Sequence, residues 1–217
     1  MTTPFRRIFG FDAHRTTVEV GATRLALWQV RDLERHVDRA ALLAAEDPAE
    51  PPYWAYLWTG ARVLAEIVPS AAGLRVVEVG CGLALPGLVA AARGARVTCV
   101  DRAIAPLAFV CASAAANELD VAVVAADVTS GALRGCFDLV LAAELLYERA
   151  AFPRIVAALA ALVAPGGRIL LTDGGRIDTR AFYDELDRAG LPWITHDERR
   201  REEGLPVTIR VVEITPR

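Results

Sequence analysis

The chain contains no lysine, and its basic side chains are 24 arginines against 27 acidic residues. We attribute the absence of lysine to codon bias in the coding gene and assign it no mechanistic role. The formal net charge is −3, so the chain lacks the basic excess that gathers nucleic-acid phosphates through counterion release. We therefore expect no nucleic-acid partner.

Long apolar segments are also missing. The longest uninterrupted apolar run covers residues 155–164, about half of what a helix needs to cross a bilayer. The first 15 residues lack the apolar segment of a secretory signal. Alanine supplies 40 of the residues in the hydrophobic share of 54%, and this share suits a packed core. We expect a cytoplasmic protein that folds as a globule and does not enter a membrane.

Cysteines are few and widely spaced. Cys81, Cys99, Cys111 and Cys136 form no C-x-x-C pair, and no histidine stands near them at a spacing that suits zinc. We expect reduced, buried thiols and no metal site.

From residue 74 onward, short β-branched runs alternate with stretches rich in alanine and leucine, which predicts a parallel sheet. Strands are expected over 74–79, 95–100, 121–125, 137–142 and 168–172, and helices over 86–93, 104–117, 152–163 and 179–189. Two last extended runs, 192–195 and 207–214, are separated by a segment too short for a crossover helix. They are predicted to pair antiparallel, with residues 199–201 in a solvated turn between them. The predicted fold class is α/β: a Rossmann-like, doubly wound seven-stranded sheet, mostly parallel, with a C-terminal antiparallel hairpin.

The segment before residue 51 has a different pattern. Residues 17–20 and 24–28 flank a Gly-Ala pair and are predicted to form a hairpin, followed by a helix over 32–45 and a linker rich in proline and acid over 46–52. Residues 1–50 are therefore expected to be an N-terminal extension or lid.

A glycine-rich loop, EVGCGLALPG over residues 78–87, follows the first strand of the alternating region. Gly80 and Gly82 permit backbone angles that a Cβ forbids and allow a ligand to lie against the main chain. A dinucleotide site prefers a small residue three positions after the second glycine, where this chain has Leu85. This weakens the hypothesis of a nicotinamide-dependent oxidoreductase. Glu78 before the glycines and a second acid after the next strand suit a ligand with a ribose and an amino acid but no phosphate, such as S-adenosylmethionine.

Two aspartates follow the next two strands. Asp101 closes the second strand, where a carboxylate accepts hydrogen bonds from both ribose hydroxyls. Asp127 lies just past the third strand, where its side chain or the neighbouring backbone can bond an adenine amino group. An aspartate at a strand end also serves as a helix cap or turn former. Their register with the glycine loop favours the binding role.

Three further segments carry a family resemblance: PYWAYLWTG over 52–60, ELLY over 144–147 and TDGGR over 172–176. With the glycine loop, they make residues 51–176 resemble the class I, seven-β-strand S-adenosylmethionine-dependent methyltransferases. More narrowly, the chain resembles the group of protein-lysine methyltransferases that includes the enzyme acting on the electron transfer flavoprotein β subunit. The resemblance implies that residues 51–217 form an S-adenosylmethionine-dependent methyltransferase domain.

The resemblance also assigns roles to individual residues. It implies that Trp58 and Gly60 border the cofactor, and that Glu78 with the 80–82 backbone holds its methionine end. Asp101 would hold the ribose.

On the acceptor side, the resemblance implies that Glu144 and Tyr147 face a target lysine of a protein substrate. Leu83, Ala84 and Leu85 depart from the small polar residues usual in the loop. Gly174 stands where the closest relatives tend to have proline.

The chemistry of an amine acceptor defines what these residues must do. Free lysine has a pKa of about 10.4, and the amine must be neutral when it attacks. We interpret Glu144 as the group that orients the ammonium and accepts the proton it releases. Tyr53, Tyr56 and Trp58 are expected to exclude water from the amine. Glu144 as a loop cap and the aromatic residues as a hydrophobic lip are the alternative interpretations.

The sequence does not determine which molecule accepts the methyl group. A small-molecule N- or O-methyltransferase and a cofactor-binding module without turnover are alternatives to a protein-lysine methyltransferase, because fold alone does not define the acceptor. The sequence indicates nothing about oligomeric state.

Overall fold

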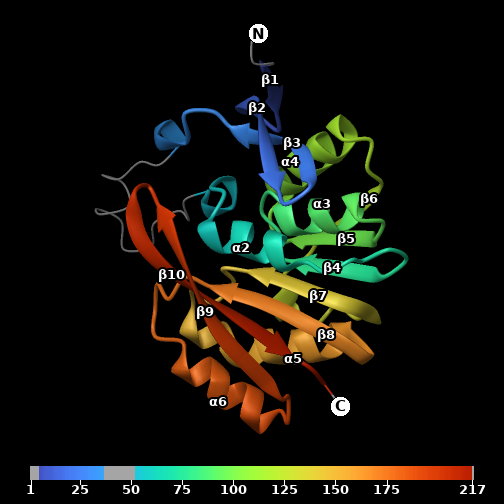
Figure 1. The fold of residues 1–217 in the computed structure, drawn as a ribbon, viewed down its shortest axis with the longest axis vertical. Coiled ribbons are helices and arrows are strands. Elements are labelled where there is room, and N and C mark those ends of the chain that lie inside the picture. The colour runs from blue at the N-terminus through green and yellow to red at the C-terminus, as the bar shows by residue number, and fades with distance from the viewer. Residues whose placement is uncertain (1–4, 37–51, 217) are drawn as a thin grey trace.

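The computed structural model describes residues 5–36 and 52–216. It contains a large sheet between two helical layers, with a small sheet at one end of the molecule (Figure 1). The large sheet consists of β4 (Arg75–Val79), β5 (Arg96–Asp101), β6 (Val121–Ala125), β7 (Phe137–Ala143), β8 (Val163–Asp173), β9 (Trp193–Glu202) and β10 (Leu205–Ile214). The helices are α2 (Thr59–Ile67), α3 (Leu85–Ala92), α4 (Ile104–Ala116), α5 (Phe152–Leu162) and α6 (Arg180–Arg188). The small sheet consists of β1 (Phe5–Ile8), β2 (Phe11–Val20) and β3 (Thr23–Val30), and the 3-10 turns are η1 (Leu33–His36), η2 (Tyr53–Ala55), η3 (Val128–Ser130) and η4 (Arg149–Ala151).

The strand order of the large sheet is β6-β5-β4-β7-β8-β10-β9. Strands β4 to β8 pair in parallel, whereas β10 pairs antiparallel with both β8 and β9. This confirms the predicted α/β class, the doubly wound seven-stranded sheet and its C-terminal hairpin. Because β4 lies between β5 and β7, the chain leaves β4 toward one edge and later returns to its other side.

Two cores cover the two faces of the sheet. In β4, Val76 packs in the core shared with α2, α3 and α4, while Val77 and Val79 pack in the core shared with α5 and α6. Strands of a parallel sheet are buried on both faces, which is why β7 is a nearly continuous apolar run and β4 carries valines on both faces.

The small sheet is joined to α4 by polar as well as apolar contacts. The backbone N–H of Trp28 donates to Ser113 Oγ at 3.0 Å, and that of Ala26 donates to Asn117 Oδ1 at 2.8 Å. The amide Nδ2 of Asn117 donates back to the Ala26 carbonyl at 2.7 Å. The predicted hairpin is thus present as β2 and β3, packed on α3 and α4. A lid function for this segment stays a prediction, and most of the predicted 32–45 helix and the 46–52 linker lie outside the described residues.

Several element predictions were wrong. Strand β9 continues through Glu202, so the arginines of residues 199–201 lie in a strand and not in a turn; only Glu203 and Gly204 connect β9 to β10. The long antiparallel pairing overrides the charged composition of that segment. Strand β8 begins at Val163, five residues before the prediction, and β1 and α2 were not predicted. All four cysteines are free, but Cys111 and Cys136 are exposed and only the other two are buried.

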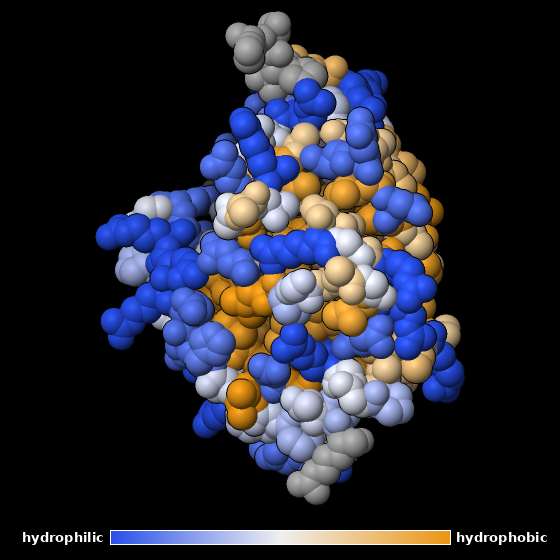
Figure 2. Space-filling view, turned by 45° about the vertical axis from the view of Figure 1, so that its right-hand side comes forward, coloured by the Kyte–Doolittle hydropathy of each residue, from blue (hydrophilic) through white to orange (hydrophobic). Residues whose placement is uncertain are grey.

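The molecular surface is mixed in character. On the face shown in Figure 2, hydrophilic side chains interrupt the apolar surface at the middle of the molecule. None of the helices in the described part of the chain has the length and apolar composition to span a membrane.

The Asn117 contact leads to a stability prediction. Replacing Asn117 with Ala leaves both the N–H and the carbonyl of Ala26 without their side-chain partner. We expect the free energy of unfolding to fall by about 1–3 kcal/mol, measured by urea titration. Asp120→Ala, an exposed change just after α4, is the control and should be nearly neutral. An unchanged midpoint for Asn117→Ala would show that these hydrogen bonds do not stabilise the junction.

Candidate active site

A cavity of about 770 Å³ opens at the carboxyl ends of β4, β5 and β7. This is the place where an open α/β sheet binds ligands, because the loops on the two sides of the central strand diverge there. Its lining includes seven of the predicted site residues: Trp58, Gly80, Gly82, Asp101, Asp127, Glu144 and Tyr147. The other two, Gly60 and Glu78, lie directly behind lining residues, as described below.

The glycine loop gives the cavity a bare backbone wall. Gly80 and Gly82 have φ of +59° and +49°, in the left-handed region that favours glycine. A Cβ on Gly80 would lie 2.8 Å from Leu145 Cδ1, and one on Gly82 would lie 3.1 Å from the Trp54 carbonyl oxygen. Neighbouring segments therefore pack against the loop too closely for side chains at these two positions.

Asp101 ties the glycine loop to the next strand. Its Oδ2 accepts from the Gly82 N–H at 3.0 Å, and its Oδ1 accepts from the Ala103 N–H at 2.9 Å. Burial raises the pKa of Asp101, and these backbone hydrogen bonds oppose that rise. Each carboxylate oxygen has a second lone pair, so both can accept one more hydrogen bond from a ligand in the cavity.

Glu78 lies under the loop and not at its surface. It is 1% exposed, and its Oε2 accepts from the Gly87 N–H at 2.7 Å. A Cβ on Gly87 would lie 2.7 Å from that oxygen, so the glycine is what allows the carboxylate to approach. Burial raises the pKa of Glu78 to about 8. In this structure Glu78 holds the start of α3, and its role at the methionine end of the cofactor stays a prediction.

Asp127 uses its carboxylate within its own loop. Its Oδ1 accepts from the backbone N–H and the hydroxyl of Thr129, at 2.7 and 2.8 Å, and these bonds lower its pKa. The side chain thus caps η3, which was the alternative interpretation. The backbone beside Asp127 lines the cavity together with Ala126 and Val128 and is left for the predicted adenine contact.

Glu144 occupies a strained position at the end of β7. Its φ is +53°, unusual for a residue with a Cβ, and such strain concentrates at functional sites. Its Oε2 accepts from the Gly174 N–H at 3.1 Å, while a Cβ on Gly60 would collide with Oε1. Gly60 therefore makes room for this carboxylate, which explains why it is glycine although it does not itself line the cavity.

The carboxylate of Glu144 is buried and only partly neutralised. Its Oε1 has no hydrogen-bond partner among the described residues. Arg176 Nε lies 3.7 Å from Oε2. Burial raises the pKa of Glu144, while the Gly174 N–H and Arg176 lower it. Because Oε1 is fully enclosed and lies against Gly60, a ligand reaches it only if one of these two residues moves.

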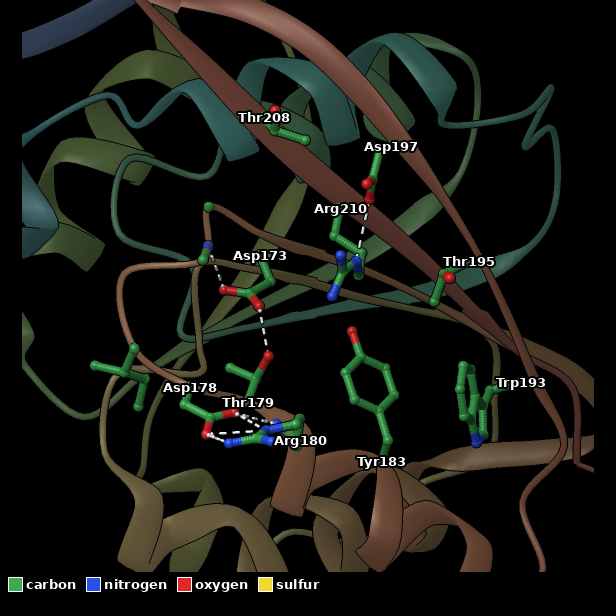
Figure 3. A pocket seen from close by; sticks show the side chains of 13 residues that line it. Asp173, Asp178, Thr179, Arg180, Tyr183, Trp193, Thr195, Asp197, Thr208 and Arg210 are labelled. Carbon is green, nitrogen blue, oxygen red and sulfur yellow. Dashed lines mark hydrogen bonds and ion pairs between the residues drawn. The ribbon is translucent and has the colours of Figure 1, made fainter.

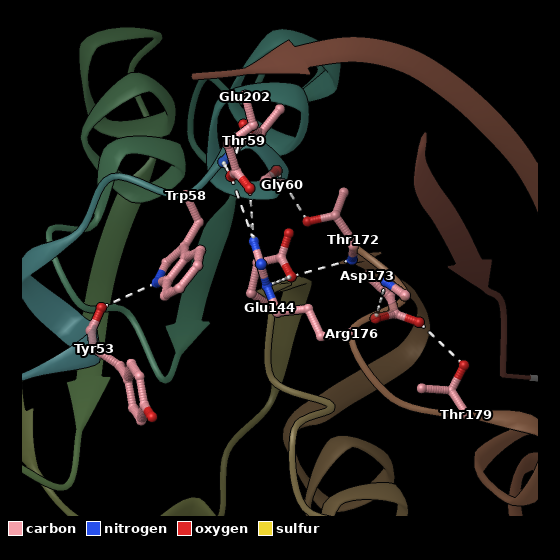
Figure 4. A network of polar contacts seen from close by, with 12 residues as sticks. Tyr53, Trp58, Thr59, Gly60, Glu144, Thr172, Asp173, Arg176, Thr179 and Glu202 are labelled. Carbon is pink, nitrogen blue, oxygen red and sulfur yellow. Dashed lines mark hydrogen bonds and ion pairs between the residues drawn. The ribbon is translucent and has the colours of Figure 1, made fainter. Parts of the chain in front are cut away.

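The aromatic segment before α2 divides between core and cavity. Trp54 packs between Phe11 and Phe109, and its ring centre lies 5.3 Å from each of theirs. This contact agrees with the alternative interpretation, a hydrophobic packing role. Trp58 donates its Nε1–H to the Tyr53 carbonyl at 3.0 Å and presents its ring beside Glu144 (Figure 4). Tyr53 and Tyr147 are about half exposed at the cavity mouth.

Sequence reasoning missed two members of this site. Arg176, in the loop after β8, lies with its guanidinium 4.1 Å from the centre of the Trp58 ring. Glu202, at the end of β9, accepts from the Thr59 hydroxyl at 3.0 Å and pairs with Arg176 at 3.2 Å (Figure 4). Arg176 belongs to the TDGGR segment that carried the family resemblance. No local sequence pattern pointed to Glu202, because it reaches α2 only through the 203–204 turn and the long pairing of β9 with β10.

A second cavity, of about 530 Å³, lies between α6 and the β9–β10 hairpin (Figure 3). Four of its charged side chains form ion pairs, Asp197 with Arg210 at 3.1 Å and Asp178 with Arg180 at 2.6 Å, and Asp173 accepts from the Gly175 N–H and the Thr179 hydroxyl. The glycine loop is not part of it. The first cavity is therefore the candidate active site.

A known protein family matches part of the chain that contributes to the first cavity. Residues 76–167 match a methyltransferase domain. The matched segment runs from β4 into β8 and so includes the glycine loop, Asp101, Asp127 and Glu144.

Curated relatives differ in what they act on. Over 156 residues the chain is 33% identical to ubiquinone biosynthesis O-methyltransferase of Pseudomonas aeruginosa, covering 63% of this chain and 66% of that protein. Over 138 residues it is 33% identical to protein N-lysine methyltransferase METTL21A of Danio rerio, covering 59% and 63%. The chain thus spans slightly less than two thirds of the length of these relatives.

Solved structures share the fold. The 16S rRNA N2 G1207 methyltransferase RsmC of T. thermophilus, in complex with AdoMet and guanosine, is 16% identical with a TM-score of 0.67, covering 99% of this chain and 52% of that one. SMU.776, a putative methyltransferase complexed with SAH, is 14% identical with a TM-score of 0.63, covering 92% and 56%. This chain shares its fold with both of these structures.

The pKa of Glu78 predicts a pH-dependent stability. Between its ordinary value of 4.5 and about 8, folded Glu78 holds a proton that the unfolded chain lacks. The free energy of unfolding therefore falls as pH rises through this window, by at most about 1.4 kcal/mol per pH unit. Glu78→Gln keeps an acceptor for Gly87 but does not titrate, so urea unfolding at about pH 5 and about pH 8 should show a smaller fall. Equal falls in the two proteins would contradict the raised pKa.

Proposed function

We propose that this chain is an S-adenosylmethionine-dependent N-methyltransferase that transfers methyl groups to lysine side chains of a protein substrate. The observation that carries the proposal is that one cavity joins the glycine loop and Asp101 to a buried carboxylate, Glu144, among aromatic side chains. The first group suits a nucleoside cofactor without phosphate, and the second suits a cationic acceptor.

The residues present fit S-adenosylmethionine. The backbone at Gly80 and Gly82 offers a wall without side chains, Asp101 keeps lone pairs for ribose hydroxyls, and the backbone around Asp127 borders the adenine end. A cavity of about 770 Å³ is ample for one such molecule. When bound, the cofactor supplies a methyl group already activated on a sulfonium. The protein has mainly to position the acceptor, which is worth about 7–11 kcal/mol of the barrier in well-oriented systems.

Glu144 has the properties needed to manage the acceptor proton. Burial raises its pKa, which moves the carboxyl group toward the range in which it exchanges a proton at neutral pH. Its negative charge attracts an ammonium that enters the cavity. Tyr53, Trp58 and Tyr147 surround the entrance and exclude water, which favours the neutral amine over the charged one.

Similarity to METTL21A supports a protein-lysine acceptor. Similarity of the same degree to the ubiquinone O-methyltransferase supports a second candidate, methylation of a small molecule. The buried carboxylate favours the amine, because a hydroxyl acceptor brings no positive charge for Glu144 to bind.

Cofactor binding tests the first half of the proposal. Asp101→Asn retains the shape of the side chain but cannot accept from two hydroxyls. We expect calorimetry to show binding of S-adenosylhomocysteine to the wild type and an affinity at least about tenfold lower for the variant, equivalent to about 1.4 kcal/mol. Asp178→Asn, in the second cavity, serves as a control and should bind normally. No heat with the folded wild type would contradict the cofactor assignment.

Transfer of a labelled methyl group tests the second half. Glu144→Gln should reduce transfer to lysate proteins by about 100-fold or more, with S-adenosylhomocysteine affinity within about twofold of wild type. Gly60→Ala, which displaces the same carboxylate without removing it, should reduce transfer as well.

The absence of lysine from the chain makes this assay clean, since any methyl-lysine found by mass spectrometry belongs to a substrate. Label confined to the low-mass fraction would support the small-molecule candidate. The absence of transfer to any acceptor would support a binding module without turnover.

A further inference from the structure

A cation-binding cage lies at the wall of the large cavity, and the protein's own arginine fills it. The guanidinium of Arg176 lies 4.1 Å from the centre of the Trp58 ring, 3.7 Å from Glu144 Oε2 and 3.2 Å from Glu202 Oε2. Figure 4 shows the guanidinium between the two carboxylates with the indole ring beside it. Two acids and one aromatic face thus surround a single positive charge.

The two carboxylates are held by bonds that do not depend on Arg176. Glu202 accepts from the Thr59 hydroxyl at 3.0 Å, and Glu144 accepts from the Gly174 N–H at 3.1 Å. Trp58 is held by its hydrogen bond to the Tyr53 carbonyl. The cage is therefore preformed, and both carboxylates would stay in place if the guanidinium left.

Arg176 is placed so that it can leave. Its side chain is 41% exposed, and it follows Gly174 and Gly175, the second with φ of +65°. The carboxylates of Glu144 and Glu202 are only 7% and 18% exposed, so leaving them without a cation would be costly, and the guanidinium can leave only when another cation replaces it. Arg176, Trp58 and Glu144 all line the cavity that contains the glycine loop, so a cation in the cage lies in the same chamber as the cofactor site.

We propose that the cage of Trp58, Glu144 and Glu202 is the site that receives the alkylammonium of the acceptor, and that Arg176 holds this site until the acceptor displaces it. This inference rests on the proposed function. It adds Glu202 as a specificity-determining residue and gives Arg176 the role of an internal stand-in for the substrate cation. A neutral hydroxyl acceptor would not displace a guanidinium from two carboxylates.

Binding of n-butylammonium, which has the end of a lysine side chain, tests the cage without cofactor or turnover. Arg176→Met empties the cage, and we expect calorimetry to show at least tenfold tighter binding of n-butylammonium than in the wild type. Glu202→Gln in the Arg176→Met background should remove most of that gain, and n-butanol should not bind. Arg180→Met is the matched control at an 89% exposed arginine and should behave as wild type. Equal affinity of Arg176→Met and wild type would overturn the proposal.

A second variant uses the absence of lysine from the chain. Arg176→Lys places a primary amine in the cage. On addition of S-adenosylmethionine, this amine would give a proton to Glu144 or water, and its lone pair would form the N–C bond. The C–S bond breaks, and the sulfur keeps the electron pair as a thioether. We expect peptide mass spectrometry to find methyl groups on position 176, added at a rate independent of protein concentration, and none in Arg180→Lys.

The outcomes separate this inference from the proposed function. Methylation of substrate lysines by the wild type, with no methylation of Arg176→Lys and no gain in n-butylammonium binding, would overturn the cage and leave the function standing. Binding of n-butylammonium to Arg176→Met, with no transfer to any amine, would support the cage as a cation site and contradict the methyltransferase function. If Arg176→Met does not fold, Arg176→Lys, which keeps the charge, decides the question alone.

Discussion

The site depends on one physical constraint: a carboxylate can be buried only where hydrogen-bond donors reach it. Glu78, Asp101 and Glu144 lie on three neighbouring strands of the sheet or directly after them, and each accepts from the N–H of a glycine, namely Gly87, Gly82 and Gly174. A main-chain donor allows such close approach best where the donor residue has no side chain. These three contacts fix the loops that surround the cavity, so the carboxylates build the site as well as serve it.

Strand order determines which of these groups can act together. Since β4 lies between β5 and β7, the loops after these three strands meet around one opening. The loop after β8 then lies between the two cavities: Arg176 lines the first, whereas Gly174 and Gly175 line the second. One short segment therefore links the acceptor side of the candidate active site to the C-terminal hairpin, which supplies Glu202.

The three carboxylates differ in what surrounds them, and this separates their roles. Glu78 is enclosed, burial raises its pKa to about 8, and its Oε2 stabilises the start of α3 by accepting from the Gly87 N–H. Asp101 faces the cavity with both oxygens already bonded to the backbone. Glu144 has a strained backbone, an enclosed oxygen without a hydrogen-bond partner and a neighbouring arginine, and this combination distinguishes it from the other two.

The sequence by itself determined the order of strands and helices after residue 74, the glycine loop and the positions of Asp101 and Glu144 at strand ends, because these depend on local periodicity and on residues close together in the chain. It did not determine which way the carboxylates turn: Asp127 turned into its own loop, and Glu78 turned beneath the loop it precedes. Only the tertiary structure decided that Glu202 and Arg176 meet Trp58 and Glu144. The contact between Arg176 and Glu202 depends on the pairing of β8 with β10 and of β10 with β9. No local sequence pattern predicts this contact. Gly60 shows the same limit, since the reason for its missing side chain is a carboxylate 84 residues further along the chain.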